Sequence, residues 1–119
     1  MLKVIFSVKK RDDITSEQFH DYWKNTHAPL VASYRERLRI KRYVQCHTIQ
    51  PELGQGLAQA RGAQSSYDGV AELWWESLED FVAVLEDQDA NAALLNDEAT
   101  FIDFEHSSIQ LAQEHEIFA

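Results

Sequence analysis

Cysteine is almost absent from this sequence, since Cys46 is the single one among 119 residues. A lone cysteine excludes a disulfide within the chain, and the N-terminus has no signal-peptide layout, so we expect a cytoplasmic location. Long apolar runs are also missing, because none approaches the roughly 20 residues needed to cross a bilayer. We therefore expect one domain over residues 1–119, large enough for a core without covalent staples, and no membrane partner.

Basic residues are scarce, with 11 lysines and arginines against 20 acidic residues and a formal net charge of -9. Nucleic-acid binding depends on neutralising phosphates, so this acidity argues against a nucleic-acid partner. The basic residues cluster at Lys9–Arg11 and between Arg35 and Arg42. We interpret the clusters as a strand end and a solvated helix end, where cations also suit the helix dipole. An anion-binding role for the second cluster is the alternative.

Motifs for bound cofactors are missing as well. Spacings typical of zinc sites, such as H-x-x-H, H-E-x-x-H or paired cysteines, do not occur, and the five histidines are scattered. The sequence has no glycine-rich phosphate loop, which argues against a nucleotide cofactor. We therefore expect neither a metal site nor a resident cofactor.

The sequence does contain a regular succession of apolar patterns. Leu2, Val4, Phe6 and Val8 alternate with other residues, which predicts a strand with one apolar face. Further strands are predicted over residues 40–49, 69–76 and 108–118, and helices over 16–39, 78–86 and 90–95. This α+β order, βαββαβ, is the ferredoxin-like pattern, with a four-stranded antiparallel sheet and the helices on one face. The other face needs water, a ligand or a second sheet to cover it.

The first helix is amphipathic and carries the histidine of greatest interest. Thr15 is expected to cap its N-terminus, with Gln18 completing a capping box. Pro29 lacks a backbone N–H and biases Ala28 away from helical angles, so we expect a kink or a fresh helical start directly after His27. An imidazole at such a break, at the edge of the apolar face, is open to a small molecule. A core histidine bonded to a nearby carbonyl is the alternative.

Glycine is concentrated in residues 51–68, where three of the four glycines lie. A hairpin closes with about two to five residues, so this long connection is expected to be a loop, with at most a short helical turn near residues 57–60. We interpret residues 52–66 as a mobile lid over a cavity. A tolerated surface insertion is the alternative.

Five segments together resemble the signature of the EthD family, which is named for a protein of ethyl tert-butyl ether degradation and belongs to the dimeric α/β-barrel superfamily. The most recognisable is F-x-x-Y-W-x-x-x-H-x-P-L-V over residues 19–31. The others follow in order over residues 42–47 (RYVQCH), 67–75 (YDGVAELWW), 101–103 (FID) and 114–115 (EH). The resemblance implies a homodimer in which two sheets pack face to face as a barrel. Haem is an alternative cofactor, since relatives in the wider superfamily bind it through a histidine, although the motif of the haem-degrading families is absent.

Side chains able to move protons lie on the segments that carry the resemblance. His27, His47 and Tyr43 are the candidate catalytic residues, because imidazole titrates near neutral pH and a neighbouring phenol adds a proton donor. On the strand over residues 40–49, Tyr43, Gln45 and His47 share one face, but the sequence leaves open which face meets the helices. A role in dimer packing is the alternative for His47.

A second set of residues is expected to line the pocket around these catalytic groups. It comprises an orienting carboxylate, two aromatic side chains and one further histidine: Glu72, Trp23, Trp74 and His115. Core or dimer packing is the alternative for the tryptophans. The two remaining histidines, His20 and His106, are expected to face water.

Three functions fit these observations. The first is a cofactor-free enzyme of isomerase, cyclase or dehydratase type, acting on a small hydrophobic carbonyl, lactone or phenol, as the resemblance implies. The second is an oxidoreductase or monooxygenase accessory protein of a degradation pathway, and the third is a dimer that only binds a small molecule. His27, His47 and Tyr43 favour the first, because proton transfer needs positioned donors and acceptors.

Overall fold

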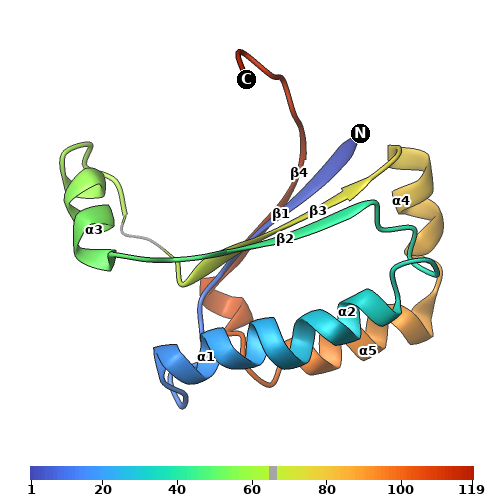
Figure 1. The fold of residues 1–119 in the computed structure, drawn as a ribbon, viewed down its shortest axis with the longest axis horizontal. Coiled ribbons are helices and arrows are strands. Elements are labelled where there is room, and N and C mark those ends of the chain that lie inside the picture. Colours follow the sequence, from blue (N-terminus) through green and yellow to red (C-terminus); the bar gives the residue numbers. More distant parts are fainter. Residues whose placement is uncertain (65–66) are drawn as a thin grey trace.

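The protein is described by a computed structural model over residues 1–64 and 67–119. Its centre is a four-stranded antiparallel sheet in the order β2-β3-β1-β4, formed by β1 (Leu2–Val8), β2 (Arg42–His47), β3 (Gly69–Trp75) and β4 (Ser108–Gln113). Helices cover one face of this sheet, and no helix of the described residues lies against the other (Figure 1). The ferredoxin-like fold expected from the sequence is confirmed.

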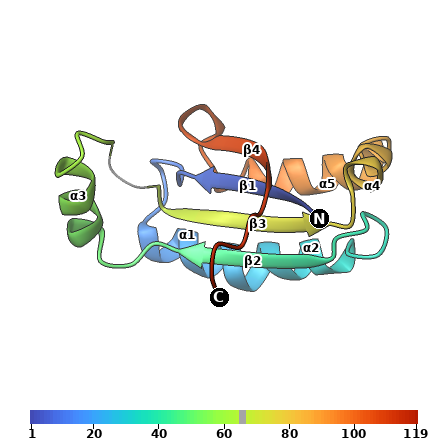
Figure 2. The ribbon, with the colours of Figure 1, turned by 90° about the horizontal axis from the view of Figure 1, so that it is seen from above.

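The covering layer consists of two helical runs (Figure 2). α1 (Ser16–Tyr22), the π-helical turn η1 (Trp23–His27) and α2 (Ala28–Ser33) lie on the side of β2. α4 (Leu78–Val84) and α5 (Gln88–Glu98) lie toward β1, and the short 3-10 turn η2 (Phe104–His106) leads into β4. Because β2 and β1 are separated by β3 in the sheet, these two runs together span its centre.

The helix starts follow the sequence closely. Thr15 accepts a hydrogen bond from the backbone N–H of Gln18 at 3.1 Å, and the side chain of Gln18 accepts one from the Thr15 N–H at 2.9 Å. This is the expected capping box, which satisfies two amides that have no partner within the helix. Ser77 also caps α4, by accepting a hydrogen bond from the backbone N–H of Asp80 at 3.1 Å.

The expected helical start directly after His27 is found, since α2 begins at Ala28, but the expected departure of Ala28 from helical angles is wrong. Ala28 keeps helical angles, with φ -59 and ψ -43, and its N–H bonds to the carbonyl of Trp23, five residues back. The helix therefore accommodates Pro29 by widening into a π turn that holds one additional residue, and Pro29 lies in the first turn of α2. Proline is tolerated there because the first amides of a helix have no intrahelical partner.

Residues 51–59 also differ from the expectation, because they form the helix α3 (Pro51–Gln59) and not a loop. α3 begins after Gln50, whose φ of 47 turns the chain away from β2, and the helix projects from the end of the sheet (Figures 1 and 2). The mobile lid assigned to residues 52–66 includes Ser65 and Ser66, which lie outside the described residues, and its mobility stays a prediction. β4 ends at Gln113, so the last strand is five residues shorter than the expected 108–118.

The hydrophobic core lies between the helices and the sheet in two clusters. One gathers around Val31, Ile40 and Trp75, and the other around Phe19, Trp23 and Phe101. Tyr43 and Leu73, cross-strand partners on β2 and β3, contact both clusters. The face of β2 that carries Tyr43, Gln45 and His47 is therefore the face that meets the helices.

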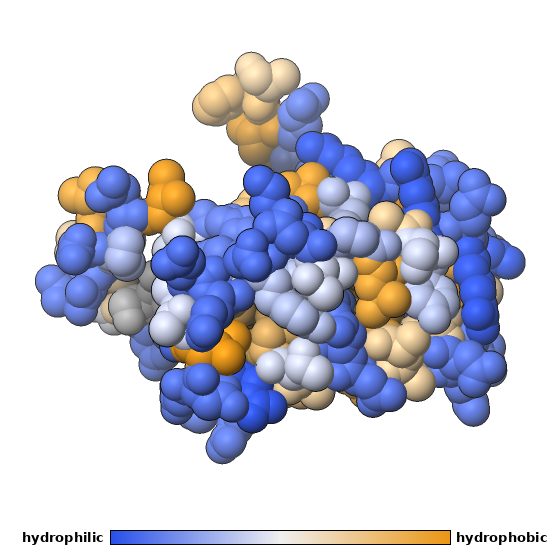
Figure 3. Space-filling model, turned by 60° about the horizontal axis from the view of Figure 1, so that its bottom comes forward, coloured by the Kyte–Doolittle hydropathy of each residue, from blue (hydrophilic) through white to orange (hydrophobic). Residues whose placement is uncertain are grey.

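Two segments project beyond this core. α3 exposes Leu53 and Leu57, and the tail after β4 exposes Ile117 and Phe118. In the space-filling view both stand out as apolar groups away from the main body (Figure 3). They account for a radius of gyration of 15.3 Å, where a compact chain of this length has about 13.5 Å. None of the helices in the described parts of the chain combines the length and apolar character required to span a membrane.

Candidate functional site between the helices and the sheet

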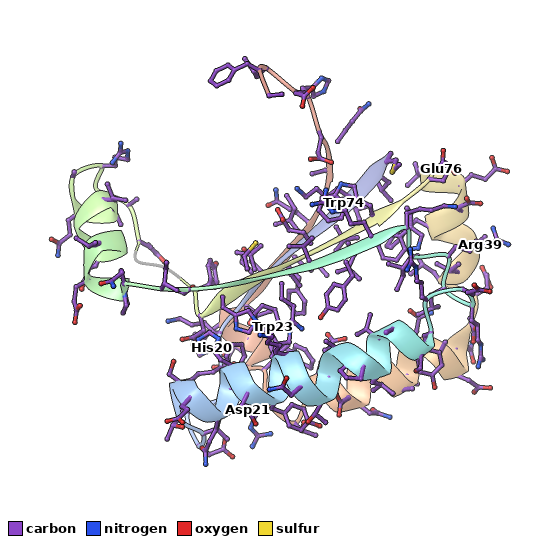
Figure 4. The ribbon with its side chains drawn as sticks, viewed as in Figure 1. His20, Asp21, Trp23, Arg39, Trp74 and Glu76 are labelled. Carbon is purple, nitrogen blue, oxygen red and sulfur yellow. The ribbon has the colours of Figure 1, made fainter. Side chains whose placement is uncertain are left out.

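Trp23 fixes the spacing between the helix layer and β3. Its side chain is 1% exposed, and its ring lies against Gly69, where an added Cβ would come within 2.4 Å of a ring carbon. Only glycine fits at this close approach. Figure 4 shows Trp23 and His20 directed from the helix toward the sheet, whereas Asp21 points to the outer side of the helix. The expected pocket-lining position of Trp23 thus falls in the interior of the helix–sheet layer.

A chain of hydrogen bonds runs along β2 beside Trp23. The Gln45 side-chain amide donates to the Trp23 carbonyl at 2.8 Å and to the Tyr43 hydroxyl at 2.7 Å. Its oxygen therefore faces Nε2 of His47, 2.8 Å away, and that nitrogen must carry the proton. His47 Nδ1 then accepts from Nδ1 of His20 at 2.7 Å, so the chain runs from the half-exposed His20 to Tyr43.

Two groups of this chain, His47 and Tyr43, are favoured in their neutral forms. Burial, together with the charges of His20 and Lys24, lowers the pKa of His47. Burial raises the pKa of Tyr43 to about 12, and the nearby Glu98 carboxylate adds to the rise. The expectation that His20 faces water is wrong, because the end of β2 brings His47 against it. The Tyr43 hydroxyl accepts its bond from Gln45, which leaves its own proton available to another acceptor.

His27 belongs to a separate group of side chains, formed with Asp97 and Tyr22. It is 4% exposed, its ring packs on Phe101, and its Nδ1 lies 2.7 Å from Oδ2 of Asp97 on α5. Oδ1 of the same carboxylate accepts from the Tyr22 hydroxyl at 2.5 Å, and this bond raises the pKa of Tyr22. A carboxylate that holds Nδ1–H of a histidine leaves Nε2 as the free acceptor, which is the arrangement of a general base and its orienting group.

Glu98 connects the two groups. Burial, together with the charge of Asp97, raises the pKa of Glu98 to about 7. Its charge in turn acts on Tyr43, so Asp97, Glu98 and Tyr43 form one electrostatically coupled set. A carboxyl group that is part protonated near neutral pH can donate or accept a proton there.

His27 and Glu98 both keep contact with solvent-accessible space. No partner is found among the described residues for Nε2 of His27 or for the Glu98 carboxylate, yet the described chain contains no fully enclosed side-chain nitrogen or oxygen without one. Each group is therefore in contact with solvent. Tyr43 also forms part of the wall of a cleft of about 320 Å³ that opens between α2 and the start of β2.

The remaining expected residues lie elsewhere. Glu72 and Trp74 are on the open face of β3, where Glu72 pairs with Lys3 at 2.9 Å and the Trp74 ring lies between Lys3 and Arg42, 4.6 Å from each (Figure 4). His115 follows β4 in the exposed tail. The structure thus brings His47 and Tyr43 together through Gln45, places His27 in the same layer, and separates Glu72, Trp74 and His115 from them.

Sequence reasoning missed the carboxylates of this layer. Asp97, and not the expected Glu72, is the carboxylate that contacts a candidate histidine, and Glu98 is a further carboxylate of this layer. Both occupy the last turn of α5, where negative charge opposes the helix dipole, and this unfavourable placement is a signal that the sequence carries. No group of three or more histidine, cysteine or acidic side chains suited to a metal ion occurs within residues 1–64 and 67–119.

The fold and the site define a small ferredoxin-like domain with titratable groups enclosed between its helices and its sheet. The family model described as the EthD domain matches residues 11–105, and the chain belongs to the EthD family. This match includes four of the five segments named above; residues 114–115 lie beyond it.

Known proteins extend the comparison. The dehydratase UstZ of Ustilaginoidea virens is 28% identical over 105 residues, covering 86% of this chain and 75% of that protein. An EthD-family protein of Bacillus halodurans has a similar structure, with a TM-score of 0.69 and 16% identity, covering 97% of this chain and 99% of that one. A protein of Bacteroides fragilis, described as dimeric and ferredoxin-like, has a TM-score of 0.63 and 13% identity, covering 95% of both chains.

Proposed function

We propose that this EthD-family protein is a dehydratase-type enzyme that removes water from a small hydrophobic carbonyl compound, using proton transfer between side chains. The observation that carries the proposal is the contact of His27 with Asp97 in the helix–sheet layer, where the charges of Asp97, Glu98 and Tyr43 also act on one another. This layer contains a base with a free nitrogen, a carboxylate that orients it, a carboxyl group with a pKa of about 7 and the hydroxyl of the half-buried Tyr43. The similarity to a dehydratase supports the same reaction class.

Each group has a role that follows from its surroundings. Nε2 of His27 takes the proton from the carbon beside the carbonyl, and Asp97 stabilises the imidazolium that forms. The Tyr43 hydroxyl donates a hydrogen bond to the carbonyl oxygen, on which negative charge develops.

The elimination is completed by Glu98. The electron pair of the broken C–H bond forms the double bond, the C–O bond breaks, and protonated Glu98 gives its proton to the departing hydroxyl, which leaves as water. His27 ends protonated and Glu98 ionised, and exchange with solvent restores both. The step is balanced without a redox partner or cofactor.

The experiment uses a matched pair of histidines. His106 also lies 2.7 Å from a carboxylate, that of Asp103, but its side chain is 66% exposed on η2. Wild type, His27→Gln and His106→Gln are incubated with a panel of β-hydroxy ketones and aldehydes, and water loss is followed by mass spectrometry. Rates are normalised to folded protein by circular dichroism.

We expect His27→Gln to lose about 10²- to 10⁴-fold in turnover, the usual contribution of a general base, and His106→Gln to retain its activity. Equal rates in the two variants, or a loss in His27→Gln that only follows the folded fraction, would show that His27 is a packing residue.

We also propose that the protein is a homodimer. The open face of the sheet and the projecting α3 and tail offer a surface for a second copy, and the related Bacteroides fragilis structure is described as dimeric. An interface of ordinary size needs about 800 Å² from each partner. Light scattering at micromolar concentration should return twice 13.7 kDa, and the mass of a single chain would contradict the proposal.

A further inference from the structure

The cleft between α2 and β2 combines an apolar floor with a cationic mouth. Val31 and Ile40, 4% and 5% exposed, form part of its floor, and Tyr43 forms part of its wall. Arg35 and Lys41 lie at its mouth and are exposed. Its volume of about 320 Å³ is at the small end of the range for ligand sites.

The charges at this mouth are unusual for an acidic chain. None of the lining residues is acidic, although the chain as a whole has a net charge of -9. Arg37 and Arg39 of the same segment are each neutralised, by Asp87 at 2.5 Å and by Asp80 at 2.9 Å. Figure 4 shows Arg39 at this end of the molecule.

Arg35 and Lys41, by contrast, have no carboxylate within 4.0 Å in the described part of the chain. Arg35 instead donates to the Lys41 carbonyl at 3.4 Å, which holds its guanidinium beside the Lys41 backbone. Arg42, the third basic residue of the lining, stacks on Trp74 toward the open face. Two cations without acidic partners therefore remain at the mouth, where a bound anion would meet both.

We infer that this cleft binds a small apolar molecule that carries a carboxylate, held at the mouth by Arg35 and Lys41 with its apolar body toward Tyr43. The ligand would be the substrate, a hydroxylated carbonyl compound whose carboxylate is remote from the reacting carbon. This part of the inference rests on the proposed function. The binding site itself stands on the cleft and its charges alone.

The test compares naphthoate with its uncharged methyl ester, which has the same aromatic body. Each is titrated into wild type, the double variant Arg35→Gln/Lys41→Gln and the control Arg61→Gln, and the amide NMR signals of Val31, Ile40 and Tyr43 report the cleft. Arg61 is an exposed arginine after α3 that bonds a backbone carbonyl, Leu57 O, at 2.9 Å, so its removal changes net charge without touching the cleft.

We expect naphthoate to shift the signals of the cleft and to bind the double variant roughly tenfold more weakly, which corresponds to about 1.4 kcal/mol. The ester should bind wild type and the double variant with equal affinity, and Arg61→Gln should bind naphthoate as tightly as wild type does. Added salt should weaken the binding of naphthoate but not that of the ester. Equal affinity of wild type for acid and ester, or shifts confined to residues outside the cleft, would overturn the inference. Binding is measured without turnover, so the ratios of affinity between wild type and the variants do not depend on whether the protein is a dehydratase. A failure of the dehydratase proposal would appear only in the turnover experiment.

Discussion

On the helix-covered face of the sheet, Tyr43, Gln45 and His47 form a chain of neutral hydrogen bonds, whereas on the open face Lys3 and Glu72 form an ion pair beside Trp74. The shifts in pKa follow the same division. In the covered layer burial raises the pKa of Glu98 to about 7 and that of Tyr43 to about 12, and lowers that of His47. All three shifts favour the neutral form, because desolvation penalises charge.

Glu114, beside the open face, shows the opposite shift. A hydrogen bond from the Trp74 indole, with the charges of Lys3 and Arg42, lowers the pKa of Glu114 and so favours its ionised form. The two faces of one four-stranded sheet therefore provide two environments. The covered layer holds Glu98, a group that can exchange protons near neutral pH, whereas the open face holds the ion pair of Lys3 and Glu72.

The largest expected effect concerns the packing that closes the covered layer. Gly69→Ala places a Cβ within 2.4 Å of the buried Trp23 ring and 2.8 Å of the Cys46 carbonyl, so strand and helix must separate. We expect the free energy of unfolding to fall by about 3 kcal/mol, the upper part of the usual cost of overpacking. Denaturant unfolding measures the change.

Gly56→Ala on α3 is the control for this substitution. No atom lies within 4 Å of an added Cβ at Gly56, and alanine in a helix is favoured over glycine by about 1 kcal/mol. This variant should be as stable as wild type or slightly more so. If Gly69→Ala behaved like Gly56→Ala, the close contact between Trp23 and β3 would not exist in solution.

The next effect is a dependence of stability on pH that arises in the covered layer. The pKa of Glu98 is about 7 in the folded protein against 4.5 when exposed, so between these values the folded chain binds a proton more tightly than the unfolded one. Stability is therefore lost as pH rises from about 4.5 to about 7, by on the order of 3 kcal/mol at most. Glu98→Gln, which stays neutral, should remove this loss.

The measurement is denaturant unfolding of wild type and Glu98→Gln at pH 4 and pH 8. The variant should be more stable than wild type at pH 8 and similar to it at pH 4. A difference that is the same at both pH values would mean that Glu98 is not desolvated in the covered layer.

The smallest effect probes the open face. A double-mutant cycle with Lys3→Met and Glu72→Gln should give a coupling of about 1 kcal/mol, since the side chains of the pair are 12% and 24% exposed. The same cycle on Arg11 and Asp13, whose side chains are 45% and 62% exposed, should give a weaker coupling that added salt removes. Couplings of equal size would remove the distinction between this pair and an ordinary surface pair.

The sequence predicts the fold well because apolar periodicity and capping are local properties. The alternation from Leu2 to Val8 and the Thr15 capping box are both found as expected. The site depends on contacts that no local pattern contains: Asp97 meets His27 across 70 positions of the chain. His20 is the next residue along the helix after the buried Phe19, so its side chain points only partly toward the core. Its partner, His47, is determined by the position of β2 in the folded chain.

The π turn at Trp23–His27 behaves as a one-residue insertion in a regular helix. Phe19 and Val31 are twelve positions apart, which in an uninterrupted α-helix of 3.6 residues per turn would rotate one about 120° from the other. One extra residue in the wide turn cancels most of this rotation, so both side chains are buried against the sheet. Removal of one exposed residue such as Asn25 would shorten the turn while leaving both flanking apolar faces aligned, yet it would shift His27 relative to Asp97. The apolar pattern that folds this helix and the wide turn from which His27 meets Asp97 are thus separable features of the sequence.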